Sequence, residues 1–286
     1  MPDRSPKNNW YQNLNLEQKS KWYGQIADAY NRTRPRYPEQ LVKRAVEIAQ
    51  LSTNAKILEI GCATGTATTT FAELGFSLVC IEPNAEFCQI LMRNCAAYEK
   101  VKIINTTFEE WELEKSQFDA VLAATSFHWV SSEVGYVKTA ETLKTDGYLI
   151  LLWNTPPQPT QEIYQKLLDP IYQTYAPDIK GYEAIATHQK NINGMGNKVI
   201  DSGKFQNLVS EELICEVTYK VDDYIALLST LSPYIAMDSE QRHTLFANLR
   251  TSLHNYHGKT INLSFLSALQ VAQKNFSTLS LGRVRE

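Results

Sequence analysis

The sequence of 286 residues predicts an α/β fold built on a mainly parallel sheet. Between residues 56 and 153, short apolar runs rich in β-branched residues alternate with stretches whose apolar residues recur at helical spacing. The first of these runs enters a turn of small residues, Gly61 to Gly65, and then a helical stretch. Because strands that alternate with helices need right-handed crossovers, we expect helices on both faces of the sheet.

The residues before the first strand predict an arm and two helices. Residues 1–17 are polar and predict a loose arm, and the apolar residues of 16–30 recur at helical spacing. The prolines of 34–38 fix extended backbone, so they separate this helix from a second one over residues 38–51. A proline in the first turn suits the start of that second helix.

The alternating part predicts five strands. They occupy residues 56–60, 77–82, 101–104, 118–124 and 147–153. The segments between them predict helices over residues 66–74, 84–97 and 132–143, and a short acidic stretch over residues 107–112.

The pattern changes after Asn154. A proline-rich connector and an amphipathic helix are predicted over residues 155–159 and 160–175. Residues 176–204 hold most of the late glycines and few periodic apolar residues, so they predict a mobile loop. Further elements are predicted as a strand over 213–221, helices over 221–231 and 238–256, and a final strand over 261–272.

These elements suggest four parts of the chain. They are an N-terminal arm and lid helix over residues 1–37, a core over 38–154, a connector and cap insertion over 155–210, and the remaining strands with cap helices over 211–286.

Composition limits the classes of function. The net charge of −3 argues against a nucleic-acid partner, which needs a basic surface. Residues 1–10 contain no apolar leader and the apolar stretch near residues 148–153 is too short to span a bilayer, so we expect a cytoplasmic protein with no membrane partner. The five cysteines show no C-x-x-C spacing, so neither a disulfide framework nor a metal site is expected. The sequence indicates no oligomeric state.

The turn at Gly61 to Gly65 predicts a nucleoside-cofactor site. Its backbone N–H groups and the following helix N-terminus face a ligand in such folds. Glu82 ends the second apolar run, 21 residues after Gly61, where an acid can accept hydrogen bonds from both hydroxyls of a ribose. Thr66 stands where a dinucleotide-binding turn has its last glycine, and no Lys-Ser or Lys-Thr pair of a phosphate-binding loop follows.

The E-x-G-x-[GA]-x-G spacing of residues 59–65, with the downstream acid Glu82, resembles motifs I and II of the class I S-adenosylmethionine-dependent methyltransferases, in the type 11 methyltransferase-domain family. The resemblance implies S-adenosylmethionine as the cofactor. It also implies a Rossmann-like, seven-stranded, mostly parallel sheet with the last strand antiparallel, an N-terminal helical lid and a helical cap insertion.

Further segments resemble one branch of that family, which includes the trans-aconitate and juvenile-hormone-acid methyltransferases. They are the strand start Phe118-Asp119, the pair His128-Trp129, and the segments 26–30, 34–38 and 232–234. The resemblance extends from about Trp22 to Gln273. Members of this branch methylate carboxylates, so it implies a small-molecule substrate with a carboxylate as the leading candidate.

The resemblance implies a set of cofactor-binding residues. They are Gly61, Cys62, Ala63, Gly65, Glu82, Pro83, Asn84, Thr107, Phe108, Ala124 and Tyr23. Two of these positions depart from the family pattern. Ala63 stands where the family has its middle glycine. The methyl group of alanine fits at this position if the φ angle of residue 63 is negative. The acid that often holds the adenine amino group is missing, so the hydroxyl of Thr107 is predicted to take its place.

The substrate is expected in the crevice between the first and fourth strands, because ligands of open α/β sheets bind where the strand order reverses. The predicted substrate-binding residues are His128, Trp129, Tyr30, Arg34, Trp153 and Tyr234. A carboxylate is ionised at neutral pH and needs no base. For a hydroxyl or amine substrate, His128 would be the candidate catalytic base, although a role in the pocket wall is favoured.

Other functions remain open from the sequence. The main alternative is a non-catalytic S-adenosylmethionine-binding protein, and the glycine spacing disfavours the other, an NAD(P)-dependent oxidoreductase. Methylene transfer to a lipid is a further possibility, but the sequence shows no acidic constellation that matches this chemistry. The segment 154–157 differs from the Asn-Pro-Pro-aromatic motif of DNA methyltransferases because Thr155 follows the asparagine.

Overall fold

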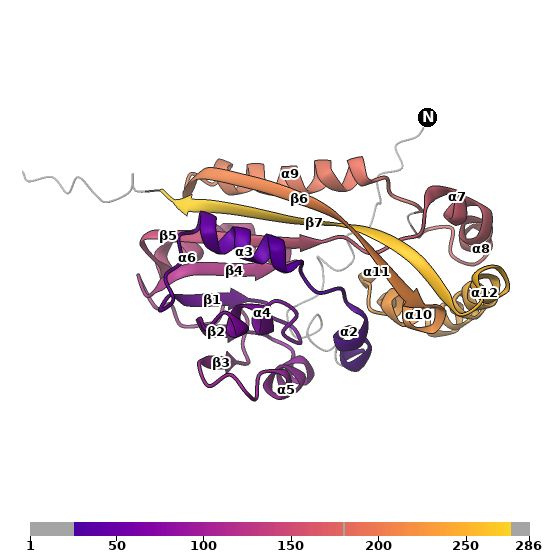
Figure 1. Ribbon diagram of the computed structural model, residues 1–286, viewed down its shortest axis with the longest axis horizontal. Helices are drawn as coiled ribbons and strands as arrows, with labels where there is room; N and C mark the ends of the chain where they lie inside the picture. Colours follow the sequence, from indigo (N-terminus) through magenta and orange to yellow (C-terminus); the bar gives the residue numbers. More distant parts are fainter. Residues whose placement is uncertain (1–25, 180, 276–286) are drawn as a thin grey trace, which may run out of the picture.

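The computed structural model describes residues 26–179 and 181–275. Within them a seven-stranded sheet has the strand order β3-β2-β1-β4-β5-β7-β6 (Figure 1). The strands are β1 (Lys56–Ile60), β2 (Ser77–Ile81), β3 (Val101–Ile104), β4 (Phe118–Ala124), β5 (Leu143–Asn154), β6 (Phe205–Lys220) and β7 (Thr260–Lys274). Strands β1 to β5 pair in parallel, whereas β7 is antiparallel to both of its neighbours. The predicted Rossmann-like fold with an antiparallel last strand is therefore confirmed.

Two groups of helices surround the sheet. Those outside the cap are α2 (Ala27–Thr33), α3 (Glu39–Ile48), α4 (Thr68–Glu73), α5 (Ala85–Asn94), the short η2 (Phe127–Trp129), α6 (Ser132–Thr142) and α9 (Ile185–Asp201). Those of the cap are α7 (Gln161–Ile163), the π-helical turn η3 (Tyr164–Leu168), α8 (Asp169–Tyr175), α10 (Val221–Ser229), α11 (Ser232–Ile235) and α12 (Ser239–His257). None of these helices combines the length and the apolar character that crossing a membrane requires.

The core strands are buried on both faces, as their nearly continuous apolar sequences require. Alternate residues of each strand point to opposite sides. Ile57 of β1 packs in one cluster with residues of α3 and α4, and its neighbour Leu58 packs in another with Ile192 and Val199 of α9. The sheet is thus the middle of three layers.

The strand order reverses between β1 and β4, which pair in parallel next to each other. Each is followed by a loop at its carboxyl end, at residues 61–65 after β1 and at residues 125–129 after β4. Because parallel strands end at the same edge of the sheet, the two loops face one crevice, as the sequence predicted.

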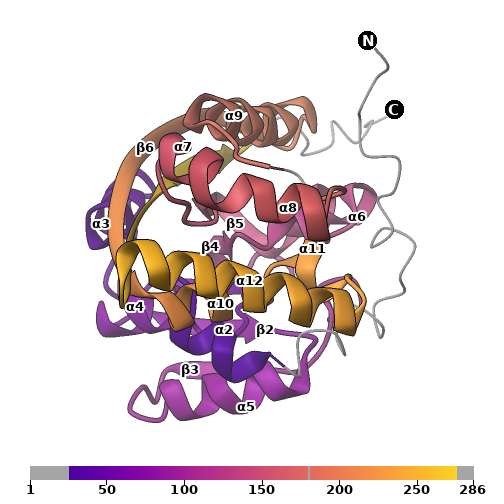
Figure 2. The ribbon, with the colours of Figure 1, turned by 90° about the vertical axis from the view of Figure 1, so that its right-hand side faces the viewer.

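The cap is carried by the two longest strands. β5 pairs with β7 only as far as Ser267, whereas β6 pairs with β7 as far as Thr260, so this two-stranded ribbon extends past the sheet. Helices α10 and α12 are connected to its far end, and they pack with α8 around a separate apolar cluster (Figures 1 and 2). The crevice therefore has the sheet edge as its floor and the cap as its roof.

The predicted mobile loop over residues 176–204 is wrong for most of its length, because α9 occupies Ile185–Asp201. Figure 1 shows α9 lying along β6. Gly196 on this helix approaches the sheet so closely that an added Cβ would lie 2.6 Å from the Gln270 amide nitrogen. The glycines of α9 lower its intrinsic helix propensity, but the burial of one face of the helix against the sheet outweighs that effect.

Two further boundaries differ from the prediction. β6 begins at Phe205, eight residues before the predicted start at residue 213, so the expected boundary between residues 210 and 211 falls inside a strand. β5 begins at Leu143 rather than at residue 147. Residues 1–25, with the predicted arm, most of the first helix and Tyr23, lie outside the described residues.

Candidate functional site

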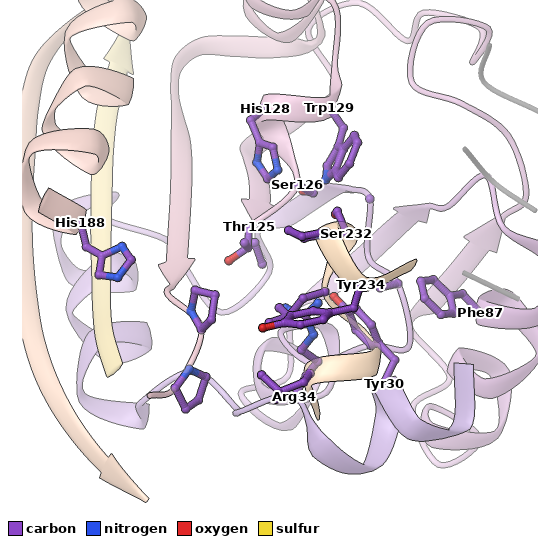
Figure 3. Close-up of a pocket in the computed structure, with 18 of the residues that line it drawn as sticks. Tyr30, Arg34, Phe87, Thr125, Ser126, His128, Trp129, His188, Ser232 and Tyr234 are labelled. Atoms are coloured by element: carbon purple, nitrogen blue, oxygen red, sulfur yellow. The ribbon is translucent and has the colours of Figure 1, made fainter. Parts of the chain in front are cut away.

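A cavity of about 510 Å³ lies between the carboxyl edge of the sheet and the cap (Figure 3). Its lining includes the turn after β1, the end of β2, the loop after β4, the connector after β5 and residues of α9 and the cap helices. Figure 3 shows His128 and Trp129 on one side, and Arg34 and Tyr234 on the other. The cavity joins the predicted cofactor region to the predicted substrate region.

The turn after β1 forms one wall of the cavity with its backbone. Gly61 has a φ of +66°, and an added Cβ there would lie 2.7 Å from the Cβ of Ser126. The Ser126 hydroxyl donates a hydrogen bond to the Ile60 carbonyl, which holds the two loops together. A side chain at Gly61 would therefore separate the loops that make the crevice.

Ala63 also lies in the left-handed region, with a φ of +49°. The sequence had predicted that alanine fits here if its φ is negative, so that condition is not met. The backbone N–H of Ala63 donates to Glu82 Oε2 at 2.9 Å, and this contact holds the residue in place. The turn therefore stores conformational strain that glycine would not.

We expect Ala63→Gly to raise the free energy of unfolding by about 0.5–1 kcal/mol. Glycine adopts a positive φ without the Cβ clash, and this gain exceeds the cost of the larger conformational entropy of glycine in the unfolded chain. The matched control is Ala67→Gly, since Ala67 is buried with a φ of −101°. Urea denaturation of both variants measures the difference. Destabilisation of equal size in the two variants would contradict the strain at Ala63.

Glu82 links the two halves of the cofactor region. Its Oε2 accepts the Ala63 N–H, and its Oε1 accepts the Asn84 N–H at 2.8 Å. The side chain is 5% exposed and lines the cavity, and burial raises its pKa to about 7. Each carboxylate oxygen retains a second lone pair, so both can accept a further hydrogen bond from a ligand.

The predicted cofactor residues fall into two groups. Seven line the cavity: Gly61, Ala63, Glu82, Pro83, Thr107, Phe108 and Ala124. Three described ones do not: Cys62, Gly65 and Asn84. The Cys62 N–H and thiol both point to the Ile81 carbonyl, Gly65 lies against Leu91, and Asn84 caps α5 by accepting the Phe87 N–H. These three support the turn and the helix start from behind.

Thr107 has its hydroxyl partly engaged. The hydroxyl donates to Glu110 Oε2 at 3.0 Å and accepts the Glu110 N–H at 3.1 Å, which caps the turn after β3. One lone pair remains, so Thr107 can still accept a hydrogen bond from an amino group.

His128 lines the cavity and is exposed to it. Partial desolvation there lowers its pKa from the ordinary value of 6.5, so the imidazole is mainly neutral at pH 7. A general base works best with a pKa near the working pH. As a neutral imidazole, His128 can donate and accept hydrogen bonds at the pocket wall.

Of the other predicted substrate residues, Trp129, Tyr30, Arg34 and Tyr234 line the cavity, whereas Trp153 does not. The indole N–H of Trp153 donates to Gln270 Oε1 at 3.1 Å, and its ring lies 5.9 Å from that of His128. Trp153 thus supports His128 from behind.

Arg34 brings a positive charge to the cavity. Its Nε donates to Thr230 Oγ1 at 2.9 Å, its Nη2 donates to the Thr230 carbonyl at 2.6 Å, and its guanidinium lies over the Tyr30 ring at 4.8 Å. Nη1 has no hydrogen-bond partner in residues 26–179 and 181–275. Among the lining residues that the structure describes, Arg34 is the only arginine or lysine.

The prediction missed several lining residues. Thr125 and Ser126 lie in the sequence run that contains His128, but their small polar side chains carried no signal of their own. Thr125 has a φ of +54°, and its hydroxyl lies 2.8 Å from that of Tyr37. His188 belongs to α9, which was predicted as loop.

Glu59 is buried behind the turn and does not line the cavity. Its Oε2 accepts the Thr68 hydroxyl at 2.6 Å, whereas Oε1 has no partner in the described part of the chain. Burial raises its pKa to about 7. Glu59 therefore contacts Thr68 behind the turn rather than the cavity.

This raised pKa predicts a pH dependence of stability. Between the ordinary value of 4.5 and about 7, Glu59 keeps its proton in the folded chain and loses it in the unfolded chain. The free energy of unfolding should therefore fall as pH rises through this window, by about 1 kcal/mol per pH unit from this residue. Urea unfolding of wild type and Glu59→Gln between about pH 5 and pH 8 measures it, and identical slopes would contradict the assignment.

The residues present fit a nucleoside cofactor. The turn at Gly61 presents bare backbone, Glu82 has acceptor capacity directed at the same cavity, and Phe108 adds a buried apolar surface. No group of three or more His, Cys, Asp or Glu side chains in the described residues is arranged to hold a metal ion.

Comparisons with known proteins agree with this geometry. Residues 57–147 match a family model described as a methyltransferase domain. An uncharacterized methyltransferase of Mycobacterium tuberculosis is 32% identical over 133 residues, which is 46% of this chain and 52% of the relative. An rRNA adenine N-6-methyltransferase of Bacillus anthracis is 28% identical over 83 residues, 29% of each chain.

The fold also matches solved structures. That of a candidate type II methyltransferase from Anaeromyxobacter dehalogenans superposes with a TM-score of 0.61 at 17% identity, covering 84% of this chain and 97% of the other. The chain spans about half the length of the curated relatives it matches first. Together the comparisons show that residues 57–147 match a methyltransferase domain and that the fold is similar to that of a solved methyltransferase-type structure.

Proposed function

We propose that this chain transfers a methyl group from S-adenosylmethionine to the carboxylate of a small molecule, as the trans-aconitate and juvenile-hormone-acid branch does. The observation that carries the proposal is the position of Arg34. Arg34 lines the same roofed cavity as Glu82 and the Gly61 turn, and its Nη1 has no hydrogen-bond partner within the described residues. One cavity thus combines a nucleoside-binding edge with an anchor for an anion.

The cofactor would be held by the residues that line the sheet edge. They are Gly61, Ala63, Glu82, Pro83, Thr107, Phe108 and Ala124. Glu82 would accept the ribose hydroxyls and Thr107 the adenine amino group, each with its remaining lone pair. When bound, S-adenosylmethionine supplies an activated methyl carbon, so the protein's task is mainly to align the acceptor.

The part of the cavity proposed to bind the methyl acceptor favours a carboxylate substrate over a hydroxyl or an amine substrate. A carboxylate is already ionised at neutral pH, and the lowered pKa of His128 makes it a weaker base than a free imidazole. Arg34 would orient the carboxylate through Nη1, while Tyr30, Trp129, Tyr234 and neutral His128 would shape the pocket and exclude water. Proton transfer plays no part in this scheme.

The roof that the cap forms over the cavity supports a small molecule rather than a nucleic acid. The cap residues Tyr164, Tyr172 and Tyr224 roof it, and they are buried. A base within a polynucleotide would need an open, basic approach surface. The rRNA methyltransferase relatives match less than a third of the chain, so they carry little weight here.

Two alternatives make different predictions. A non-catalytic S-adenosylmethionine-binding protein would bind the cofactor and methylate nothing. An NAD(P)-dependent oxidoreductase would bind a dinucleotide. Dinucleotide-binding turns have a last glycine that lets the helix pack closely on the strand, and the buried Thr66 stands at that position here.

Calorimetric titration with S-adenosylhomocysteine, with NADH as the control, tests the cofactor. We expect micromolar binding of S-adenosylhomocysteine alone. A panel of carboxylic acids, their methyl esters and an RNA oligonucleotide, incubated with methyl-labelled donor, then tests the acceptor. Label in the acids that is lost in Arg34→Gln supports the proposal; labelled RNA, or NADH binding, overturns it. Cofactor binding with no labelled product favours the non-catalytic alternative.

A further inference from the structure

Four tyrosines from three segments of the cap meet at the roof of the cavity. They are Tyr164 on η3, Tyr172 on α8, Tyr224 on α10 and Tyr234 on α11, and all four line the cavity. Each is 8% exposed or less. We call them the tyrosine cluster.

The cluster has more hydrogen-bond donors than acceptors to receive them. The hydroxyls of Tyr172 and Tyr234 lie 2.6 Å apart, so one donates to the other. Tyr164 and Tyr224 make no hydrogen bond through their hydroxyls within the described residues. Each phenol carries one proton, so three of the four protons have no protein acceptor in that part of the chain. A buried donor without a partner is unfavourable, so a ligand that displaces water from the roof must supply acceptors.

The surroundings favour a neutral acceptor over an anion. Burial raises the pKa of each tyrosine in the cluster, so all four remain protonated donors at neutral pH. Arg34, the one lysine or arginine among the described lining residues, is assigned above to the reacting carboxylate. A second buried anion at the roof would meet no further lysine or arginine among the lining residues that the structure describes.

The rest of the roof is apolar. The rings of Tyr164 and Tyr172 are stacked at 5.8 Å with an angle of 11°, and Leu228, Leu231 and Ile179 complete the lining. Flat ring faces and aliphatic side chains suit a planar or conjugated body.

From these contacts we infer that the methyl acceptor has an apolar, planar body bearing a neutral carbonyl oxygen, as in a keto, ester or amide group, and that the tyrosine cluster donates hydrogen bonds to this oxygen. The inference rests on the proposed function for the place of the carboxylate. It adds a substrate class, namely oxo-substituted aromatic or conjugated acids, and assigns specificity to the four phenol hydroxyls.

The test compares pairs of acids that differ only in the carbonyl oxygen. The probes are 4-acetylbenzoate against 4-isopropylbenzoate, and 3-(4-acetylphenyl)propanoate against 3-(4-isopropylphenyl)propanoate, titrated calorimetrically into the full chain saturated with S-adenosylhomocysteine. One neutral hydrogen bond predicts that the acetyl member of at least one pair binds about 3- to 10-fold more tightly.

Replacing all four tyrosines by phenylalanine should bring the two members of that pair within about twofold, since it removes the donors and keeps the rings. The control is Tyr175→Phe on the same α8, because Tyr175 does not line the cavity. Arg34→Gln should weaken both members equally and leave their ratio unchanged. Retained S-adenosylhomocysteine binding shows that each variant is folded.

The outcomes separate this inference from the proposed function. Equal affinities in the wild type, an acetyl preference that survives the fourfold replacement, or no binding of any probe would overturn the inference while cofactor binding stands. If the wild type fails to bind S-adenosylhomocysteine, the proposed function falls. The probe pairs are then titrated without cofactor, and the same ratios decide the role of the tyrosine cluster.

Discussion

Glu82→Ala is expected to weaken the binding of S-adenosylhomocysteine by about 2 kcal/mol or more, roughly 30-fold, because charge-assisted hydrogen bonds are the strong ones. The carboxylate lines the cavity and has acceptor capacity left for two hydroxyls. Its loss also leaves the N–H groups of Ala63 and Asn84 without their acceptor. Both effects act on the cofactor half of the site, so calorimetry with S-adenosylhomocysteine measures their sum.

The control for this variant is Glu59→Gln. Glu59 is a second buried carboxyl with a raised pKa near the same turn, but it does not line the cavity. Its replacement should change stability and its pH dependence while leaving the affinity for S-adenosylhomocysteine within about twofold. Unchanged affinity in a folded Glu82→Ala variant would remove Glu82 from the binding site.

Gly61→Ala is expected to lower the free energy of unfolding by about 2–4 kcal/mol, from the left-handed backbone and from overpacking against Ser126. At a φ of +66° the new Cβ would lie 2.7 Å from the Ser126 Cβ and 3.2 Å from its Oγ. The two loops of the crevice must then move apart, so binding of S-adenosylhomocysteine should be lost as well. Urea denaturation and calorimetry measure the two effects.

The chain offers a matched control at Gly203. Its φ is +67°, and within the described residues an added Cβ there would meet no atom within 4 Å. Gly203→Ala should therefore cost only the backbone penalty of about 1–2 kcal/mol. The double variant Gly61→Ala/Ser126→Gly should recover part of the steric difference. Equal destabilisation at Gly61 and Gly203, with no coupling to Ser126, would show that the close approach is unimportant.

The cofactor half of the site was predictable because its signals are local. Residues 56–65 form a strand and a turn whose glycines are needed by the backbone of that same segment. Glu82 stands at the end of the next strand, and the parallel pairing of β1 with β2 brings it to Ala63. Spacing along the sequence was therefore enough to place both.

The cap half depended on contacts between segments far apart in the sequence. Gly196 reads locally as a residue that weakens a helix, yet it is the point where α9 meets Gln270. Trp153 lies near the end of β5, but its indole N–H donates a hydrogen bond to Gln270 and the residue does not line the cavity. Neither partner can be identified from local periodicity.

By itself the sequence determined the α/β fold, the strand and turn of the proposed nucleoside site, and the position of Glu82 beside that turn, because these follow from periodicity, turn chemistry and the edge at which parallel strands end. Only the tertiary structure decided the positive φ of Ala63, the neutral state of His128 and the meeting of the four tyrosines. Burial, strain and unpaired donors are properties of packed neighbours, and packing brings together residues that the chain order keeps apart.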